Sequence, residues 1–145
     1  MKVKVLNGPN LNMLGKRDAN HYGTETLKDI EALLTDSFPD HQLSFFQSNL
    51  EGELVEAVQS LTEGDFDGLI ANFGGYSHTS VAIRDALELL EIPIVEVHLS
   101  NIHAREEFRE RTLTGAVASG IITGFGKQSY VLGVRALEGL ADKSR

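Results

Sequence analysis

The sequence predicts an α/β domain in which a parallel sheet carries helices on both faces. Short apolar runs, typical of buried strands, alternate five times with longer segments whose apolar residues have helical spacing. Alternation of this kind produces parallel strands joined by crossover helices. We expect strands near residues 2–7, 42–48, 68–73, 93–99 and 119–125. We expect helices near residues 25–36, 52–63, 79–90, 103–111 and 128–141.

Local signals support several of these boundaries. Thr24 precedes the first helix, and Asn49 and Glu51 precede the apolar positions of the second, as N-terminal capping residues do. Pro93 marks the break after the third helix. Five strands favour the flavodoxin-like strand order 2-1-3-4-5. Residues 142–145 are expected to fray.

Composition limits the classes of protein that fit. The 145 residues suffice for one domain, 1–145, with no repeat or linker. The chain has no cysteine, which excludes disulfides and cysteine-ligated zinc. A formal net charge of −8 argues against a nucleic-acid partner, and no apolar run is long enough to cross a membrane. No signal-peptide pattern opens the chain, so we expect a cytoplasmic protein.

The fourth strand carries an unusual polar face. Alternation along residues 94–100 puts Glu96, His98 and Ser100 on one side of an otherwise apolar strand. Glu96 lies about 7 Å from His98 along the strand, close enough to fix the tautomer of its ring. The pair is typical of a general acid, although a core histidine satisfied by a carboxylate remains an alternative.

Polar residues also follow the first and third strands. Residues 7–15 contain three asparagines, and residues 72–78 contain Asn72, two glycines and His78. Ligands bind at the carboxyl ends of strands in open parallel sheets. We therefore expect a binding site at this edge, and in so acidic a chain Arg17, Arg105 and Arg109 are the candidates to hold an anion.

Residues 15–23 are polar and bounded by glycines, which predicts a surface loop able to close over the site. The loop carries Arg17 and Tyr22. A phenol is a poor base at neutral pH unless a nearby cation stabilises its phenolate. Arg17 is placed to be that cation, whereas the alternative is a tyrosine that only anchors the loop.

Three signatures together resemble those of the type II 3-dehydroquinate dehydratases. The first comprises residues 10–18 with 21–23, the second residues 75–87, and the third residues 96–101 with 105–109. The resemblance extends over nearly the whole chain and implies the same flavodoxin-like fold. It also implies an anti elimination of water from 3-dehydroquinate, giving 3-dehydroshikimate through an enol or enolate, in the shikimate or quinate pathway.

The resemblance implies a role for each catalytic residue. Tyr22, activated by Arg17, removes the proton next to the ketone; Asn12 stabilises the enolate oxygen through a water. His98, held by Glu96, protonates the departing hydroxyl. The resemblance also implies substrate-binding residues: Leu99, Ser100 and Asn72 for the carboxylate, His78 and Arg109 for ring hydroxyls, and Gly74 and Gly75 for close backbone approach.

We expect no metal and no organic cofactor, because these residues supply base, acid and oxyanion donor and the scattered histidines lack metal-ligand spacing. The resemblance implies a homododecamer, a tetramer of trimers, in which Asp85 reaches a neighbouring subunit's site. An acid on the largely apolar helix 79–90 is consistent with a cationic partner across an interface, although an exposed acid near Arg84 is the alternative.

Other functions fit the residues less well. Another proton abstraction next to a carbonyl needs the same base, oxyanion donor and acid, so only the resemblance names the substrate. A receiver-type signalling domain needs acidic residues where this chain has Asn7, Asn10 and Asn72. A flavin binder needs a phosphate-binding loop after the first strand, where Pro9 has no backbone N–H to donate. Phe73 and residues 112–113 depart from the family pattern.

Overall fold

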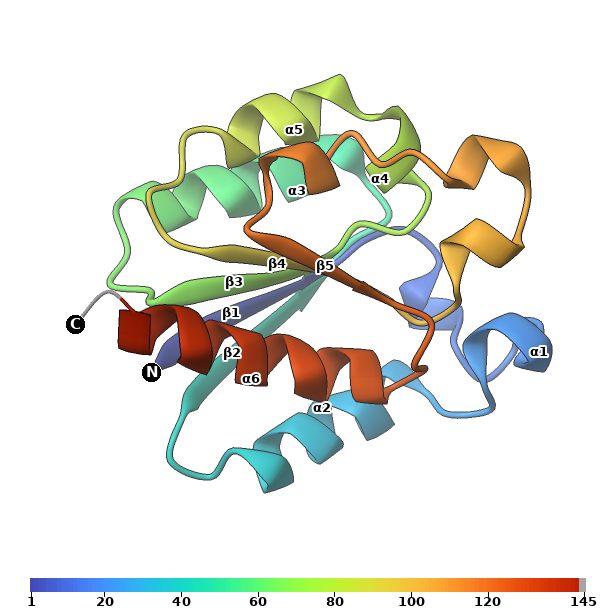
Figure 1. Ribbon diagram of the computed structural model, residues 1–145, viewed down its shortest axis with the longest axis horizontal. Helices are drawn as coiled ribbons and strands as arrows, with labels where there is room; N and C mark the ends of the chain where they lie inside the picture. The colour runs from blue at the N-terminus through green and yellow to red at the C-terminus, as the bar shows by residue number, and fades with distance from the viewer. Residues whose placement is uncertain (144–145) are drawn as a thin grey trace.

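A parallel sheet of five strands runs through the middle of the molecule, in the order β2-β1-β3-β4-β5 (Figure 1). The structure is a computed structural model that describes residues 1–143. Its strands are β1 (Lys2–Asn7), β2 (Gln42–Gln47), β3 (Gly68–Asn72), β4 (Ile94–His98) and β5 (Gly120–Thr123). The predicted strand order is confirmed, and every strand lies within the range expected from the sequence.

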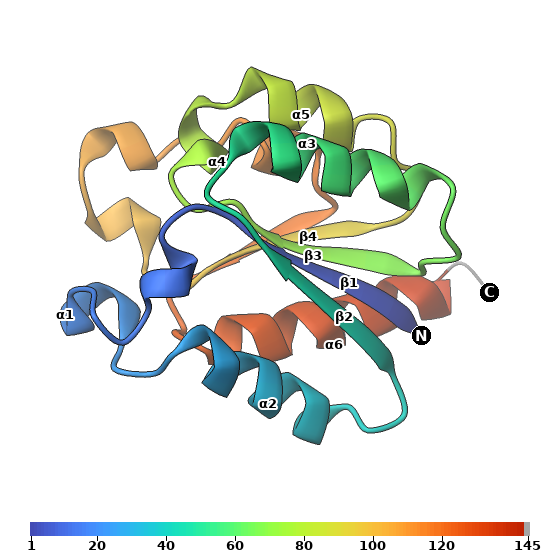
Figure 2. The same cartoon turned by 180° about the vertical axis from the view of Figure 1, so that it is seen from behind.

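Two pairs of helices cover the two faces of the sheet. Helices α2 (Leu27–Ser37) and α6 (Gln128–Lys143) lie on one face, and α3 (Glu51–Gln59) and α5 (Val81–Leu87) lie on the other (Figures 1 and 2). Consecutive residues of a strand point to opposite faces, so β1 contributes to two separate apolar cores. The sheet is therefore fixed from both sides.

The N-terminal caps differ in detail from the sequence prediction. Helix α2 begins after Thr26, not Thr24: the Thr26 hydroxyl accepts from the Asp29 backbone N–H at 3.2 Å, and the Asp29 carboxylate accepts from the Thr26 N–H at 2.9 Å. This reciprocal capping box satisfies two backbone donors and sets the start of the helix. Helix α3 is preceded by Ser48, whose hydroxyl accepts from the Leu50 N–H at 2.9 Å.

Helix α5 (Val81–Leu87) is shorter than the predicted helix 79–90, and a separate short helix precedes it. A short helix, α4 (Tyr76–Thr79), ends where Ser80 takes an extended conformation. The Ser80 hydroxyl then accepts from the Ile83 N–H at 3.0 Å and starts α5. The break places α4, and with it His78, at the carboxyl end of β3.

The predicted helix 103–111 is wrong. Its residues form two 3-10 turns, η3 (Ile102–Ala104) and η4 (Glu107–Arg109), separated by extended backbone. The segment has no apolar stripe to pack on the core: Ile102 is buried, but Phe108 is 64% exposed. Its arginines turn toward the site described below. The other 3-10 turns are η1 (Leu11–Met13), η2 (Ser60–Thr62) and η5 (Gly115–Val117).

The predicted surface loop 15–23 contains one short helix, α1 (Ala19–Tyr22), capped by Asp18. Gly15 and Gly23 bound the segment with φ of 94° and 73°, backbone conformations that glycine adopts without strain. Helix α1 and the 3-10 turns of residues 102–109 lie at the same end of the molecule, away from the chain termini (Figures 1 and 2).

The described part of the chain ends in a helix, although the sequence predicts fraying from residue 142. Helix α6 continues through Asp142 and Lys143, while residues 144–145 of the predicted tail lie outside the described residues. Within residues 1–143, no helix is long and apolar enough to span a membrane.

Candidate active site

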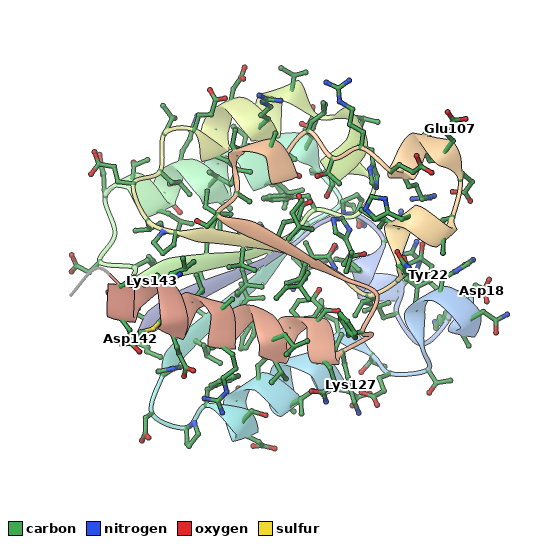
Figure 3. The ribbon with its side chains drawn as sticks, viewed as in Figure 1. Asp18, Tyr22, Glu107, Lys127, Asp142 and Lys143 are labelled. Atoms are coloured by element: carbon green, nitrogen blue, oxygen red, sulfur yellow. The ribbon has the colours of Figure 1, made fainter. Side chains whose placement is uncertain are left out.

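A cavity of about 120 Å³ opens at the carboxyl ends of β1, β3 and β4. Tyr22, on α1, lines this cavity. Figure 3 shows Tyr22 at the end of the molecule that carries the 3-10 turns of residues 102–109. Most residues predicted from the sequence line the cavity: Arg17, Tyr22, Asn72, Gly74, Gly75, His78, His98, Leu99, Ser100 and Arg109. Pro9, Asn10, Leu11, Ile102 and Arg105 line it as well.

Glu96 and His98 form a buried pair at the end of β4. The His98 Nε2 lies 3.1 Å from the Glu96 Oε2, and both side chains are almost wholly shielded from solvent. Glu96 does not line the cavity but lies behind His98. Because Nε2 faces the carboxylate, Nδ1 is the ring nitrogen left to exchange a proton with a ligand.

Sequence reasoning missed a third member of this group, Thr114. Its hydroxyl donates a hydrogen bond to the Glu96 Oε1, so each oxygen of the buried carboxylate has a partner. Thr114 lies 18 residues beyond Glu96, in a loop with no motif to identify it. Only the tertiary fold reveals the contact.

His78 lies beside His98, with the two ring centroids 6.0 Å apart. Its Nδ1–H donates to the Arg111 carbonyl at 2.9 Å, which leaves Nε2 as an acceptor. Burial lowers the pKa of His78, and the nearby His98 and Arg109 lower it further. The neutral form of the His78 ring is therefore favoured, and it suits an acceptor for a hydroxyl group.

Two arginines lie over the ring of Tyr22. The Arg17 guanidinium carbon is 3.6 Å from the ring centroid, and that of Arg105 is 5.1 Å away. Arginine over an aromatic face is a favourable cation–π contact, and both cations also stabilise any negative charge on the phenol oxygen. The predicted Arg17–Tyr22 association therefore exists, and Arg105 joins it.

The gathering of arginines gives the site a strong preference for anions. Burial lowers the pKa of Arg17; the charges of Arg105 and Arg109 lower it further, whereas Tyr22 opposes them. Like charges held this close are relieved by an anionic ligand. Arg105 also donates from Nη1 to the Ser100 hydroxyl at 3.3 Å, and its buried Nε has no hydrogen-bond partner among the described residues.

Asn72 is held in one orientation by two neighbours, and one of them is itself held by Asn7. Its Oδ1 accepts from the Gly74 N–H at 3.1 Å, and its Nδ2 donates to the Tyr130 hydroxyl at 2.9 Å. The Tyr130 hydroxyl in turn donates to the Asn7 Oδ1 at 2.6 Å. One N–H of the Asn72 amide therefore remains for a ligand.

The structure does not bring Asn12 into the cavity. Asn12 is exposed, whereas Asn10 lines the cavity. Asn10 has a φ of 69°, which few residues other than glycine and asparagine adopt, and its N–H donates to the Asn49 Oδ1 at 2.9 Å. The turn after β1 thus directs the first asparagine of the motif to the site and the second to solvent.

The glycines that follow β3 shape the floor of the cavity. Gly74 has a φ of 57°, and a Cβ on Gly75 would meet no atom within 4 Å, so a ligand has room there. A Cβ on Gly8 would lie 2.4 Å from the Phe73 carbonyl oxygen. Phe73, a departure from the family pattern, is fully buried in the core with no role in the cavity wall.

Asp85 does not reach the cavity of its own chain, because it lies exposed on α5. Within residues 1–143, no three histidine, aspartate or glutamate side chains are grouped closely enough to hold a metal ion.

Comparison with known proteins identifies the family. Residues 1–138 match the family model "Dehydroquinase class II". The chain is 50% identical to a 3-dehydroquinate dehydratase of Pelodictyon phaeoclathratiforme over 97% of this chain and 93% of that protein. It is 50% identical to one of Fusobacterium nucleatum over 92% and 94% of the two chains.

Solved structures agree with the sequence matches. The type II dehydroquinase of Butyrivibrio crossotus superimposes with a TM-score of 0.92 at 38% identity, covering 95% of this chain and 97% of that one. The type II dehydroquinase of Propionibacterium acnes gives a TM-score of 0.89 at 36% identity, covering 97% and 96%. With its strand order and its sequence in agreement, the chain belongs to the class II dehydroquinase family.

Proposed function

We propose that this enzyme removes water from 3-dehydroquinate to give 3-dehydroshikimate, a step of shikimate or quinate metabolism. The observation that carries the proposal is the presence in one cavity of His98, held from behind by the buried Glu96, and of Tyr22 beneath two arginines. A proton donor and a potential phenolate base are the two groups that such an elimination needs. The names of the relatives at 50% identity support the choice of substrate.

Tyr22 is the proposed base. Its phenolate, stabilised by Arg17 and Arg105, takes the proton from the carbon between the ketone and the carbon that bears the hydroxyl. The electron pair of that C–H bond moves into an enolate, so the ketone oxygen acquires negative charge.

Asn10 is the proposed donor to the enolate oxygen. We assigned this role to Asn12 from the sequence, but Asn10 is the asparagine that lines the cavity. Its amide donates to the developing charge either directly or through a water.

His98 is the proposed general acid. In its protonated form, Nδ1–H transfers a proton to the departing hydroxyl as the C–O bond breaks, and water leaves. The enolate collapses in that same step: its electron pair restores the ketone, forms the new conjugated double bond and expels the hydroxyl group that His98 protonates. Glu96 holds Nε2 and balances the charge of the imidazolium.

The remaining residues bind the substrate. The carboxylate is held by Asn72, by Ser100 and by the backbone at Leu99. The neutral His78 accepts from one ring hydroxyl through Nε2, and the Arg109 guanidinium donates to another. Arg109 is itself oriented by an ion pair with Glu106.

The proposal is tested by mixing the purified protein with 3-dehydroquinate and following the absorbance of the conjugated product. We expect turnover without added metal or cofactor. Borohydride added with substrate tests for a Schiff base, which the unrelated type I enzymes form through a lysine. No lysine lines the cavity among the described residues, so we expect the treated protein to stay active. Absence of product, or inactivation by borohydride, would contradict the proposed reaction.

We also propose that the enzyme assembles as a dodecamer, a tetramer of trimers, in which Asp85 reaches a neighbouring site. Asp85 is exposed on α5, four residues after Val81 and four before Leu89 in the turn that follows, and these two apolar side chains are each 59% exposed. Exposed apolar residues beside an acid are consistent with an interface in which the acid meets an arginine.

A further inference from the structure

The loop after η4 passes behind both histidines of the site. Thr114, in this loop, is 1% exposed, and its hydroxyl donates to the Oε1 of Glu96. The Oε2 of the same carboxylate lies 3.1 Å from the Nε2 of His98. The three side chains form a buried chain of hydrogen bonds that ends at the proposed general acid.

The backbone of the same loop is fixed to the element that carries the second histidine. The Leu113 N–H donates to the Ser77 carbonyl at 2.7 Å, and the Arg111 carbonyl accepts from His78. At Gly115 the loop lies so close to Glu96 that an added Cβ would be 2.9 Å from its Oε2. Thr114 is therefore presented to Glu96 by a backbone with little freedom.

We propose that Thr114 is a positioning residue for His98, acting through Glu96. A carboxylate with one partner can rotate about its last side-chain bond and offer either oxygen to the ring. A second hydrogen bond from Thr114 removes that freedom, because Oε1 is occupied and only Oε2 faces Nε2. The ring of His98 then keeps Nδ1 toward the cavity.

The assignment explains why a hydroxyl is required at this position. A valine has nearly the same shape as threonine but would leave Oε1 buried without a donor, and a buried charged acceptor without its partner is costly. Glu96 would then turn or draw in water, and the ring it holds would lose its orientation. The inference rests on the proposed role of His98 as the acid.

The test compares kcat and KM for Thr114→Val, which removes the hydroxyl, and Thr114→Ser, which keeps it. We expect Thr114→Val to lower kcat by roughly 10- to 100-fold, the value of one hydrogen bond to a charged group, with KM changed by less than about threefold. We expect Thr114→Ser to retain kcat within about threefold, because the donor remains. Thr112→Val is the matched control, since Thr112 is in the same loop and lacks the bond to Glu96.

The outcomes separate this inference from the proposed reaction. If the wild-type protein does not dehydrate 3-dehydroquinate, the proposed function fails. If the wild type is active and Thr114→Val keeps its kcat, the role of Thr114 is overturned alone. Equal losses in the Val and Ser variants would assign the effect to packing and would also overturn it. Should Thr114→Val not fold, Thr114→Ala replaces it, and failure of both to fold would show a structural role instead.

Discussion

The guanidinium of Arg17 lies over the face of the Tyr22 ring, 3.6 Å from its centroid. Both residues belong to one segment bounded by Gly15 and Gly23, so they move together if the segment moves. The segment is also tied at its base, where Glu25 forms an ion pair with Lys127. The proposed base and its proposed activating cation thus belong to one segment of the chain.

This relationship predicts that the effects of Tyr22 and Arg17 are coupled. Tyr22→Phe and Arg17→Ala should each lower kcat by about 10²-fold or more, because each removes part of the same proton transfer. The double variant should lose little beyond the larger single loss. A double-mutant cycle on kcat measures the coupling. A loss in the double variant equal to the product of the two single losses would show that the two residues act independently. Arg17→Lys is the control that keeps the charge and loses the planar stack.

Asn10 and Asn12 offer a matched pair of variants. Asn10→Asp should lower kcat by about 10²- to 10³-fold, because aspartate keeps the size of the side chain but cannot donate to an enolate. Asn12→Asp adds the same charge at an exposed position and should leave kcat unchanged within about twofold. Steady-state kinetics of the two variants checks this, and the reverse pattern would return the role to Asn12.

The lowered pKa of His78 predicts that the stability of the protein changes with pH. Burial lowers its pKa from 6.5, so the unfolded chain binds the proton more readily than the folded protein does. The contribution of His78 to stability is therefore present above pH 6.5 and is lost as the pH falls below it. Between about pH 7.5 and about pH 5, Tm should fall more for the wild type than for His78→Gln. Calorimetry at the two pH values checks the difference, and an equal fall in both proteins would contradict it.

The proposed reach of Asp85 into a neighbouring subunit's site predicts that activity depends on assembly. Asp85→Ala should lower kcat/KM by about tenfold, because each site would lose a charged group supplied by its neighbour. Asp36→Ala, an exposed acid on α2 at the opposite face of the sheet, is the control. Light scattering coupled to size exclusion measures the mass of each variant. A wild type that is fully active as a monomer would contradict both the assembly and the shared site.

Most of the fold follows from patterns that the sequence shows directly. Apolar runs predicted all five strands, because buried parallel strands need continuous apolar residues. The number of strands and the family resemblance predicted their order. The helix predicted at 103–111 failed because its only strong apolar residue, Phe108, faces solvent. In this segment the backbone forms two 3-10 turns instead of a helix, and Arg105 and Arg109 line the cavity.

The candidate site was predicted where its residues are close in sequence or follow strand ends. Glu96 and His98 were found because strand alternation places them together. Thr114 and Tyr130 were missed because they reach the site from distant segments. The family resemblance implied Asn12, and the sequence does not show that the chain takes a positive φ at Asn10, the asparagine that lines the cavity. A cytoplasmic location remains a prediction.

The most direct test of the account is kcat for dehydration of 3-dehydroquinate by His98→Ala compared with the wild type. General acid catalysis contributes about 10²- to 10⁴-fold, so we expect a loss of that size with an unchanged fold by circular dichroism. A His98→Ala variant that folds and turns over within about threefold of the wild type would contradict the assignment of the acid, and with it the mechanism proposed for this site.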